Sequence, residues 1–223
     1  MEEIKKNMIK VLGIDFGSML FALYNEIIWL TFQWIEFKEL FGTKESRIEL
    51  MNEVAPFFFF TIQKVLRENL MLGISKITDP VKSCGKRNTT INAIPMFIED
   101  NNFKNELEKD IKEILDYSSF CRDWRNRWIA HLDYELATNK QNAKPLELAT
   151  RQKLKFTIEK LQDFYHKIES KYFNSRTGFE FLSSHNGVIF LLHAIENGQY
   201  FSRMKHEKKI SDEWENESYI SKV

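Results

Sequence analysis

The feature of this sequence that most constrains its fold is a run of large, mostly apolar residues spaced three or four positions apart. It is clearest in one stretch, where the repeated residues are Phe103, Leu107, Ile111, Ile114, Ser118, Cys121, Trp124 and Trp128. This spacing places side chains on one face of an α-helix. Alternating patterns typical of β-strands are almost absent from the chain. The sequence therefore predicts an all-α protein, an antiparallel bundle of helices.

The same spacing predicts where the other helices lie. Besides the helix that begins near residue 101, expected helices cover residues 4–41, 45–77, 91–98, 146–172 and 186–195. Gly42 is expected to end the first of them, which Gly13 or Gly17 could also interrupt. Pro56 is expected to restart the second. The connections between them are predicted to be loops.

Four consecutive phenylalanines, Phe57–Phe60, follow this proline. They cannot all lie on one face of a helix, so the helix is expected to be covered on several sides or to contribute to a subunit interface. Of the two alternatives, we favour burial in the core.

Composition predicts one helical domain over residues 1–202, followed by a charged tail, 203–223, that is expected to be mobile. With 43% hydrophobic residues among 223, the chain can bury a full core. The 29% of charged residues exclude an integral membrane protein, and no membrane partner is expected.

The two cysteines and the N-terminus bear on compartment and cofactors. Cys84 and Cys121 lie far apart with no CxxC pair, so neither a disulfide framework nor a zinc site is predicted. The first thirteen residues carry charges where a signal peptide needs an apolar core. Together these features predict the cytoplasm. No sequence motif for a nucleotide, metal or serine hydrolase site is present, so no cofactor is expected.

The balance of charge limits how the chain could hold nucleic acid. Lys and Arg number 32 and Asp and Glu also number 32, so any such contact needs a local basic patch. One candidate is the turn-rich segment between residues 78 and 90, where Asp79 is the only acidic residue beside Lys82, Lys86 and Arg87. Such a cluster is usually a solvated loop, and its meaning depends on what lies nearby.

The second candidate, residues 120–134, is the richest in chemistry. Three arginines and one histidine fall within ten positions, at the end of the strongest predicted helix. On a continuous helix, Asp123, Arg127 and His131 would share a face. A purely structural reading also exists, in which basic residues complement the helix dipole and Asp123 pairs with Arg127.

Residues 125–131, RNRWIAH, resemble the R-polar-x-x-x-x-H motif of HEPN domains, helical bundles that often act as ribonucleases. The longer segment DWRNRWIAHLD resembles the corresponding part of the AbiU-type, abortive-infection HEPN family. The stretch ITDPVKSCGKRNTTI is similar to that family's loop after its second long helix. The resemblance covers about residues 1–200.

The resemblance implies a metal-independent endoribonuclease whose site forms at a homodimer interface. Arg125 would stabilise the phosphate, Asn126 would orient the ring or the phosphate, and His131 would act as base or acid. These residue types suit attack by a ribose 2′-OH, because histidine titrates near neutrality and a guanidinium stabilises charge on phosphorus. The products would be a 2′,3′-cyclic phosphate and a 5′-OH. A role in phage defence or a toxin–antitoxin system is implied, with an antitoxin or another defence-system protein as partner.

Two questions stay open at this point. On a straight helix Arg125 lies about 120° from His131, whereas Arg127 aligns better. The family pattern favours Arg125 as the phosphate ligand, with Arg127 as second choice and Arg122 adding positive potential. RNA is expected to reach the site through Lys82, Lys86 and Arg87. The alternative function is a HEPN module that binds RNA, a nucleotide or a protein without cutting; a plain helical interaction module is a third reading.

Overall fold

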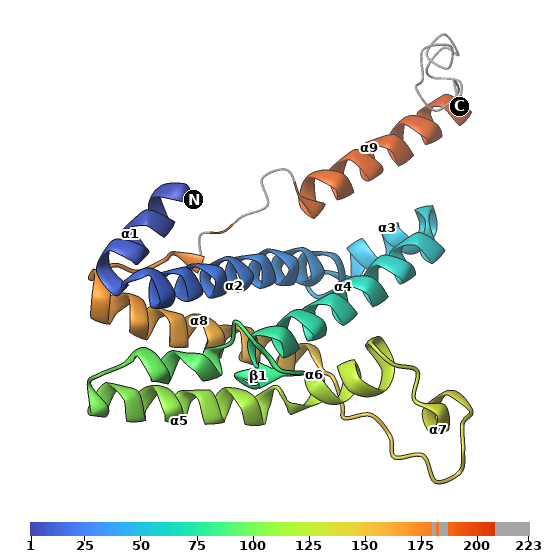
Figure 1. Cartoon of the computed structure of the whole chain (residues 1–223). Helices are drawn as coiled ribbons and strands as arrows, with labels where there is room; N and C mark the ends of the chain where they lie inside the picture. Colours follow the sequence, from blue (N-terminus) through green and yellow to red (C-terminus); the bar gives the residue numbers. More distant parts are fainter. Residues whose placement is uncertain (180–181, 183–186, 208–223) are drawn as a thin grey trace. The chain divides into compact units, whose positions relative to one another are not determined.

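The computed structural model describes residues 1–179, 182 and 187–207, and nearly all of its regular structure is helical (Figure 1). The predicted all-α class is confirmed. The elements in chain order are α1 Glu2–Leu12, α2 Ile14–Phe41, α3 Glu45–Val54, α4 Pro56–Ile77, β1 Lys82–Ser83, β2 Lys86–Arg87, the 3₁₀-helix η1 Ile91–Phe97, α5 Asn101–Tyr117, α6 Ser119–Trp124, the π-helix η2 Arg125–Ile129, α7 Tyr134–Ala137, α8 Arg151–Phe173 and α9 Val188–His206.

The chain divides into two compact units. One consists of residues 1–35 and 62–183, and the other of residues 36–61 and 184–223, of which residues 187–207 are described after the gap. The first unit contains α1, most of α2 and α4, and everything from the hairpin to α8. The second contains α3, α9 and the adjoining ends of α2 and α4. Within the described ranges, none of the helices combines the length and the apolar character needed to span a membrane.

The core of the first unit follows from the predicted stripe. Along α5, the side chains of Phe103, Leu107, Ile111 and Ile114 are all buried. This face packs against α8, whose buried residues include Leu154, Ile158, Leu161 and Ile168. Asp100 caps α5 by accepting hydrogen bonds from the amides of Asn102 and Phe103 at 3.0 and 3.2 Å.

Gly13 and Gly17 have different structural roles at the start of the chain. The break between α1 and α2 lies at Gly13, whose φ of +79° is costly for other residues. Gly17 is inside α2, and a Cβ there would lie 2.6 Å from the carbonyl oxygen of Met8. Of the two glycines, then, Gly13 ends the first helix, and Gly17 lets α1 approach α2 closely.

Several predicted boundaries are confirmed and two are wrong. Helix α2 ends directly before Gly42, and α4 begins at Pro56. The helix expected from residue 146 begins at Arg151, because Thr150 provides its cap by accepting a hydrogen bond from the amide of Lys153 at 3.1 Å. The last helix runs to His206 and not to residue 195, so Arg203 lies in its final turn. The remaining tail, 208–223, lies outside the described residues.

The phenylalanine run is mostly exposed. Phe59 is buried, but Phe57, Phe58 and Phe60 are 82%, 54% and 64% exposed. The favoured core prediction is therefore wrong for three of the four residues, because consecutive positions point around the helix and only one faces inward. A subunit interface remains the prediction for the other three.

Candidate functional site

The helix that carries the motif changes character inside it. Helix α6 ends at Trp124, and Arg125–Ile129 form a π-helix in which the amide of Ala130 donates to the carbonyl of Arg125 at 2.9 Å. Such i to i+5 segments are rare and often found at functional sites. His131 lies beyond the last helical residue, so the shared face expected of a continuous helix does not extend to it. Asp123 and Arg127 do pair, at 3.3 Å.

Arg125 is fixed by a carboxylate from a distant part of the sequence. Its Nη1 donates to Oδ1 of Asp79 at 2.7 Å, and Arg122 Nη1 lies 3.5 Å from the same oxygen. The other terminal nitrogen of Arg122 donates to the carbonyl of Thr78 at 2.7 Å. The Asp79 side chain is 16% exposed and that of Arg125 is 32% exposed. The pair is thus partly shielded from water, while donors of the Arg125 guanidinium stay accessible.

The segment around Asp79 is itself held firmly. The Thr90 hydroxyl lies 2.7 Å from the Asp79 carbonyl oxygen, and Asn92 Nδ2 donates to the same oxygen at 2.9 Å. Thr90 also caps η1, because its side chain accepts a hydrogen bond from the amide of Asn92. The loop after α4 therefore contacts the motif through the side chain of Asp79.

Beyond Asp79 the loop forms a small hairpin that the sequence did not predict. Cys84 and Gly85 both have positive φ, +48° and +77°, which matches a two-residue turn of type I′. In the ladder, Lys82 lies opposite Arg87. Lys82, Lys86 and Arg87 are all exposed, and none forms an ion pair with any residue that the structure describes. Like charges opposite each other destabilise a ladder, so this hairpin is suited to an anionic partner.

Arg127 is engaged on every side. Its Nε lies 3.5 Å from Asp133 Oδ2, and Nη1 lies 3.3 Å from Asp123 Oδ1. The same Nη1 lies 3.4 Å from the carbonyl oxygen of Pro145, and Nη2 donates to the carbonyl of Lys144. The Arg127 side chain is 19% exposed. Its contacts join the motif to both ends of the following loop.

His131 stands in a short exposed arch between Ile129 and Asp133. Its side chain makes no hydrogen bond or ion pair with the described part of the chain. Its neighbours Trp128, Leu132 and Tyr134 are 37%, 71% and 68% exposed. Large side chains are therefore exposed both before and after His131 in the sequence. Asn126 is also exposed and without a side-chain partner among the described residues.

Two pKa values near the motif are displaced. The backbone amide of Leu136, with help from the Arg127 guanidinium, holds the pKa of Asp133 below its usual range. Burial raises the pKa of the Cys121 thiol far above its usual range, which keeps the sulfur protonated and unreactive. Among the described residues, no cluster of three or more His, Cys, Asp or Glu is arranged to hold a metal ion.

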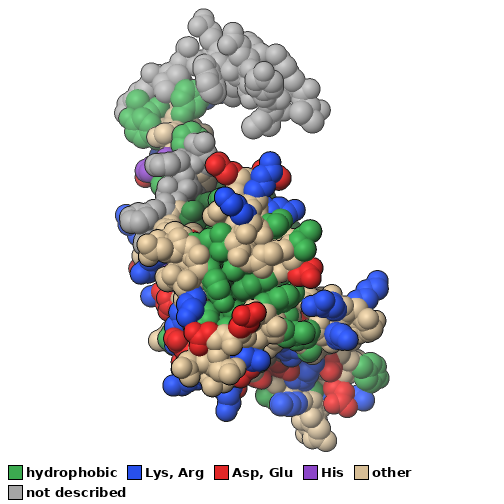
Figure 2. Space-filling model, turned by 60° about the vertical axis from the view of Figure 1, so that its left-hand side comes forward, with side chains coloured by type: hydrophobic (Ala, Val, Ile, Leu, Met, Phe, Trp, Pro, Cys, Tyr) green, Lys and Arg blue, Asp and Glu red, His purple; other side chains and the backbone are tan. Residues whose placement is uncertain are grey.

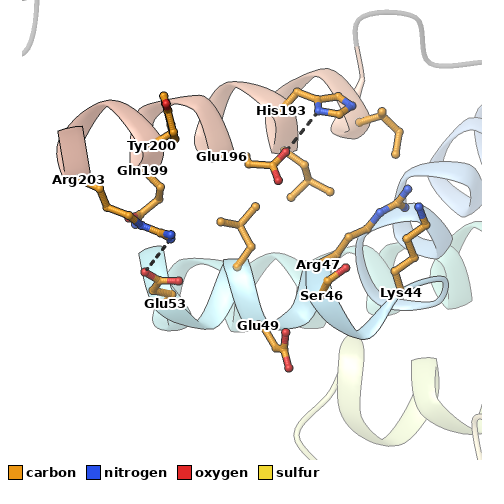
Figure 3. A pocket seen from close by; sticks show the side chains of 13 residues that line it. Lys44, Ser46, Arg47, Glu49, Glu53, His193, Glu196, Gln199, Tyr200 and Arg203 are labelled. Atoms are coloured by element: carbon orange, nitrogen blue, oxygen red, sulfur yellow. Dashed lines mark ion pairs between the residues drawn. The ribbon is translucent and has the colours of Figure 1, made fainter. Parts of the chain in front are cut away.

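A cavity of about 510 Å³ lies between α3 and α9 in the second unit (Figure 3). Both arginines that line it have acidic neighbours: Arg47 pairs with Glu39 at 2.7 Å, and Arg203 lies 3.8 Å from Glu53. Apolar residues such as Leu50 line it as well. None of the predicted site residues lines this cavity.

With the motif geometry described, the family can be assigned. The family model HEPN_AbiU2, described as AbiU2, matches residues 14–190. The chain belongs to the AbiU2 HEPN family. This family is related to abortive infection, and the matched range includes both the hairpin and the motif. No curated protein and no solved structure matches the chain.

In this AbiU2 HEPN domain, the structure brings together some predicted site residues through contacts that the sequence did not reveal. Arg122 and Arg125 meet at Asp79, at the base of the hairpin that carries Lys82, Lys86 and Arg87. The sequence signal for Asp79 was its position as the only acid in a basic loop. Two further residues, Trp124 and Asp133, were not singled out for the contacts that they make on the other side of the motif. No side-chain hydrogen bond or ion pair joins Arg125, Asn126 and His131 to one another in the single chain.

Proposed function

We propose that this AbiU2 HEPN domain is a metal-independent endoribonuclease whose site forms between two copies of the chain. The observation that carries the proposal is the combination of Arg125, fixed by Asp79 at 2.7 Å, with an exposed His131 just past the end of the π-helix. One group is a preorganised cation, and the other is a free imidazole. Cleavage by 2′-OH attack requires both.

The proposed reaction uses His131 of both subunits. One His131 accepts the proton of the ribose 2′-OH as this oxygen attacks phosphorus. The bond between phosphorus and the 5′ oxygen breaks, and the partner subunit's His131, in its protonated form, gives a proton to that leaving oxygen. Arg125 stabilises the charge that grows on the non-bridging oxygens. Asn126 orients the phosphate or the imidazole.

Arg125 is favoured over Arg127 as the phosphate ligand by what each one contacts. A guanidinium has five N–H donors, and Arg125 spends one of them on Asp79. Arg127 directs its three nitrogens at two carboxylates and two carbonyls of the protein. Arg122 adds positive potential, and the hairpin cations Lys82, Lys86 and Arg87 hold the RNA backbone.

A homodimer is supported by the apolar surface of the single chain. Trp128, Leu132 and Tyr134 are exposed around His131. On the face shown in Figure 2, hydrophobic side chains also form a continuous area edged by charged groups. A twofold axis next to the motif would bring two copies of His131 together. Light scattering should give about twice the chain mass of 26.6 kDa; a strictly monomeric protein at micromolar concentration would contradict a shared site.

The deciding experiment is a cleavage assay with purified, EDTA-treated protein on a mixed pool of RNA. Wild type should cut and leave 2′,3′-cyclic phosphate ends, detected by mass spectrometry of the products. His131→Ala should abolish cutting while folding and dimerisation persist. His193→Ala is the matched control, because that histidine is exposed on α9, outside the motif, and should leave cleavage unchanged.

Two further controls make the result specific. A 2′-deoxy substitution at the cleaved position should block the reaction, because no nucleophile remains. RNA that stays intact with the wild type, yet binds it, would favour the alternative of a non-catalytic binding module.

The family's relation to abortive infection supports a role in defence against phage, with cytoplasmic RNA as the substrate. We propose that an antitoxin or another defence-system protein restrains the activity until infection. Co-expression with genomic neighbours should show which protein relieves growth arrest by the wild type but is dispensable with His131→Ala.

A further inference from the structure

The arch that carries His131 is closed at both ends by hydrogen bonds to the π-helix. At its start, the amide of Ala130 donates to the carbonyl of Arg125 at 2.9 Å. At its end, the amide of Asp133 donates to the carbonyl of Arg127 at 3.1 Å. The carboxylate of Asp133 then lies 3.5 Å from the Arg127 side chain. Arg127 therefore binds the end of the arch with both its backbone and its side chain.

Asp133 links this arch to the loop that follows. Its Oδ1 caps α7 by accepting hydrogen bonds from the amides of Glu135 and Leu136 at 3.1 and 3.0 Å. Its Oδ2 faces Arg127. One carboxylate thus fixes the direction in which the chain leaves the arch.

The far end of the loop returns to the same arginine. Arg127 contacts the carbonyl oxygens of Lys144 and Pro145, eleven and twelve positions after Asp133. Asp123 completes the closure: Oδ1 accepts from Arg127, and Oδ2 accepts from the amide of Glu147 at 2.8 Å. The segment from 133 to 145 is a closed loop with one guanidinium at its neck.

We propose that Arg127 is a positioning residue that clamps this loop and thereby fixes the arch of His131, and that it does not bind the RNA phosphate. The proposal deepens the function proposed above, because the importance of the arch rests on the role of His131 in cleavage. The physical reason is the geometry of the guanidinium. Its flat, forked set of five donors is spread over three nitrogens and can bind acceptors from three separate segments, whereas a lysine has three donors on a single nitrogen.

Two variants separate clamping from phosphate binding. Arg127→Lys keeps the charge and loses the fork, and Asp133→Asn keeps the shape and removes one acidic neighbour of Arg127. A clamp predicts that both variants lower kcat at least tenfold while KM and the salt dependence of RNA binding stay at wild-type values. A phosphate ligand predicts near-normal kcat for Arg127→Lys, and tighter RNA binding for Asp133→Asn because a negative charge is removed. The second pattern would overturn the proposal.

A readout without RNA tests the clamp directly. Lys140 is a trypsin site within the loop, whereas the bond after Lys144 precedes Pro145 and is not cut by trypsin. A closed loop resists cleavage. Trypsin should cut the folded wild type slowly after Lys140, and it should cut Arg127→Lys and Asp133→Asn there several-fold faster. Glu159→Gln is the control, because it removes an exposed ion pair on α8 with Lys155, which lies at 3.6 Å, and should match the wild type.

The cleavage assay and the trypsin assay test the two proposals separately. If the wild type cuts no RNA, the proposed function fails, while faster trypsin cleavage in the two variants would still establish the clamp. An unchanged trypsin rate in both variants overturns the clamp, whatever happens to kcat. Thermal unfolding followed by circular dichroism confirms that each variant is folded at the assay temperature.

Discussion

The two loops that flank the π-helix are both tied to arginines, but in opposite ways. The upstream loop is held at its base, where Asp79 meets Arg122 and Arg125, and the strands of its hairpin carry three exposed cations without an ion-pair partner in the described chain. The downstream loop is held at both ends by Arg127. The cations of the upstream loop are available to a partner, whereas the cation of Arg127 is used to close the downstream loop.

This contrast shows that the arginines of the motif cannot be ranked by their position on an ideal helix. Sequence spacing favoured Arg127 as the neighbour of His131, yet its donors face Asp123, Asp133 and two carbonyls. Arg125 has one carboxylate partner and open donors. The number of donors that remain free, rather than the helical angle, separates the two.

The largest effect on RNA cleavage is expected from removing Arg125, whose guanidinium has donors that no group of the described chain occupies. Arg125→Ala should lower kcat for RNA cleavage by about 10²–10³-fold, the loss typical of a preorganised group that stabilises developing charge. Arg127→Ala should lower kcat less. Single-turnover kinetics with saturating protein measures both. The reverse order would move the phosphate role to Arg127 and remove the contrast between the loops.

A smaller effect is expected from the cations of the hairpin strands. Changing Lys82, Lys86 and Arg87 together to serine should flatten the salt dependence of RNA binding by about two units, since each lost phosphate contact to a single strand removes about 0.7. Turnover of bound RNA should stay nearly unchanged. Filter binding over a range of salt, in a His131→Ala background, measures the slope.

The downstream loop supplies the matched control. Lys140→Ser with Lys144→Ser removes two cations from the clamped loop and should leave the slope close to that of the parent. Equal flattening by both sets of changes would mean that the two loops bind RNA alike.

Much of the fold was predictable because local signals decide it. The end of α2 before Gly42 and the start of α4 at Pro56 both depend on the backbone preferences of single residues. The apolar residues that begin at Phe103 predicted the buried face of α5, because their spacing along the chain is also a local signal. The exposure of Phe57 was not predictable, because hydrophobicity says that a side chain avoids water but not which molecule covers it.

The residues of the candidate site could be predicted from the sequence, but their contacts in space could not. Arg125 and His131 stand out by motif, but the pairing of Arg125 with Asp79 spans 46 positions and depends on how the α4 loop folds back. The π-helix was hidden too, since its extra residue per turn leaves the helical apolar pattern nearly intact. Long-range polar contacts and local helix type are set by tertiary structure.

Trp124 offers a milder way to loosen the downstream loop. Its Nε1 donates to the carbonyl of Glu147 at 2.8 Å, and Arg67 lies over its ring at 5.2 Å. Trp124→Phe keeps an aromatic ring and loses the donor, so it should destabilise the domain by about 1 kcal/mol. Urea unfolding measures this change. The same variant should raise trypsin cleavage after Lys140 less than Arg127→Lys does, because the arginine clamp remains.

The smallest expected effect is a pH dependence of the clamp. The pKa of Asp133 is lowered in the folded chain by the amide of Leu136 and by Arg127, so its carboxylate stabilises the fold above the ordinary aspartate pKa of about 3.9. This contribution is lost as the pH falls through the lowered folded value. Wild type should therefore have a slightly higher urea midpoint than Asp133→Asn at pH 7, and the gap should close towards pH 3. The effect is small because the carboxylate is open to solvent and screened by it. Asp123, which also faces Arg127, is present in both proteins, so its ion pair is common to the two sides of the comparison. A gap that persisted at pH 3 would mean that the negative charge of Asp133 is not what stabilises the downstream loop.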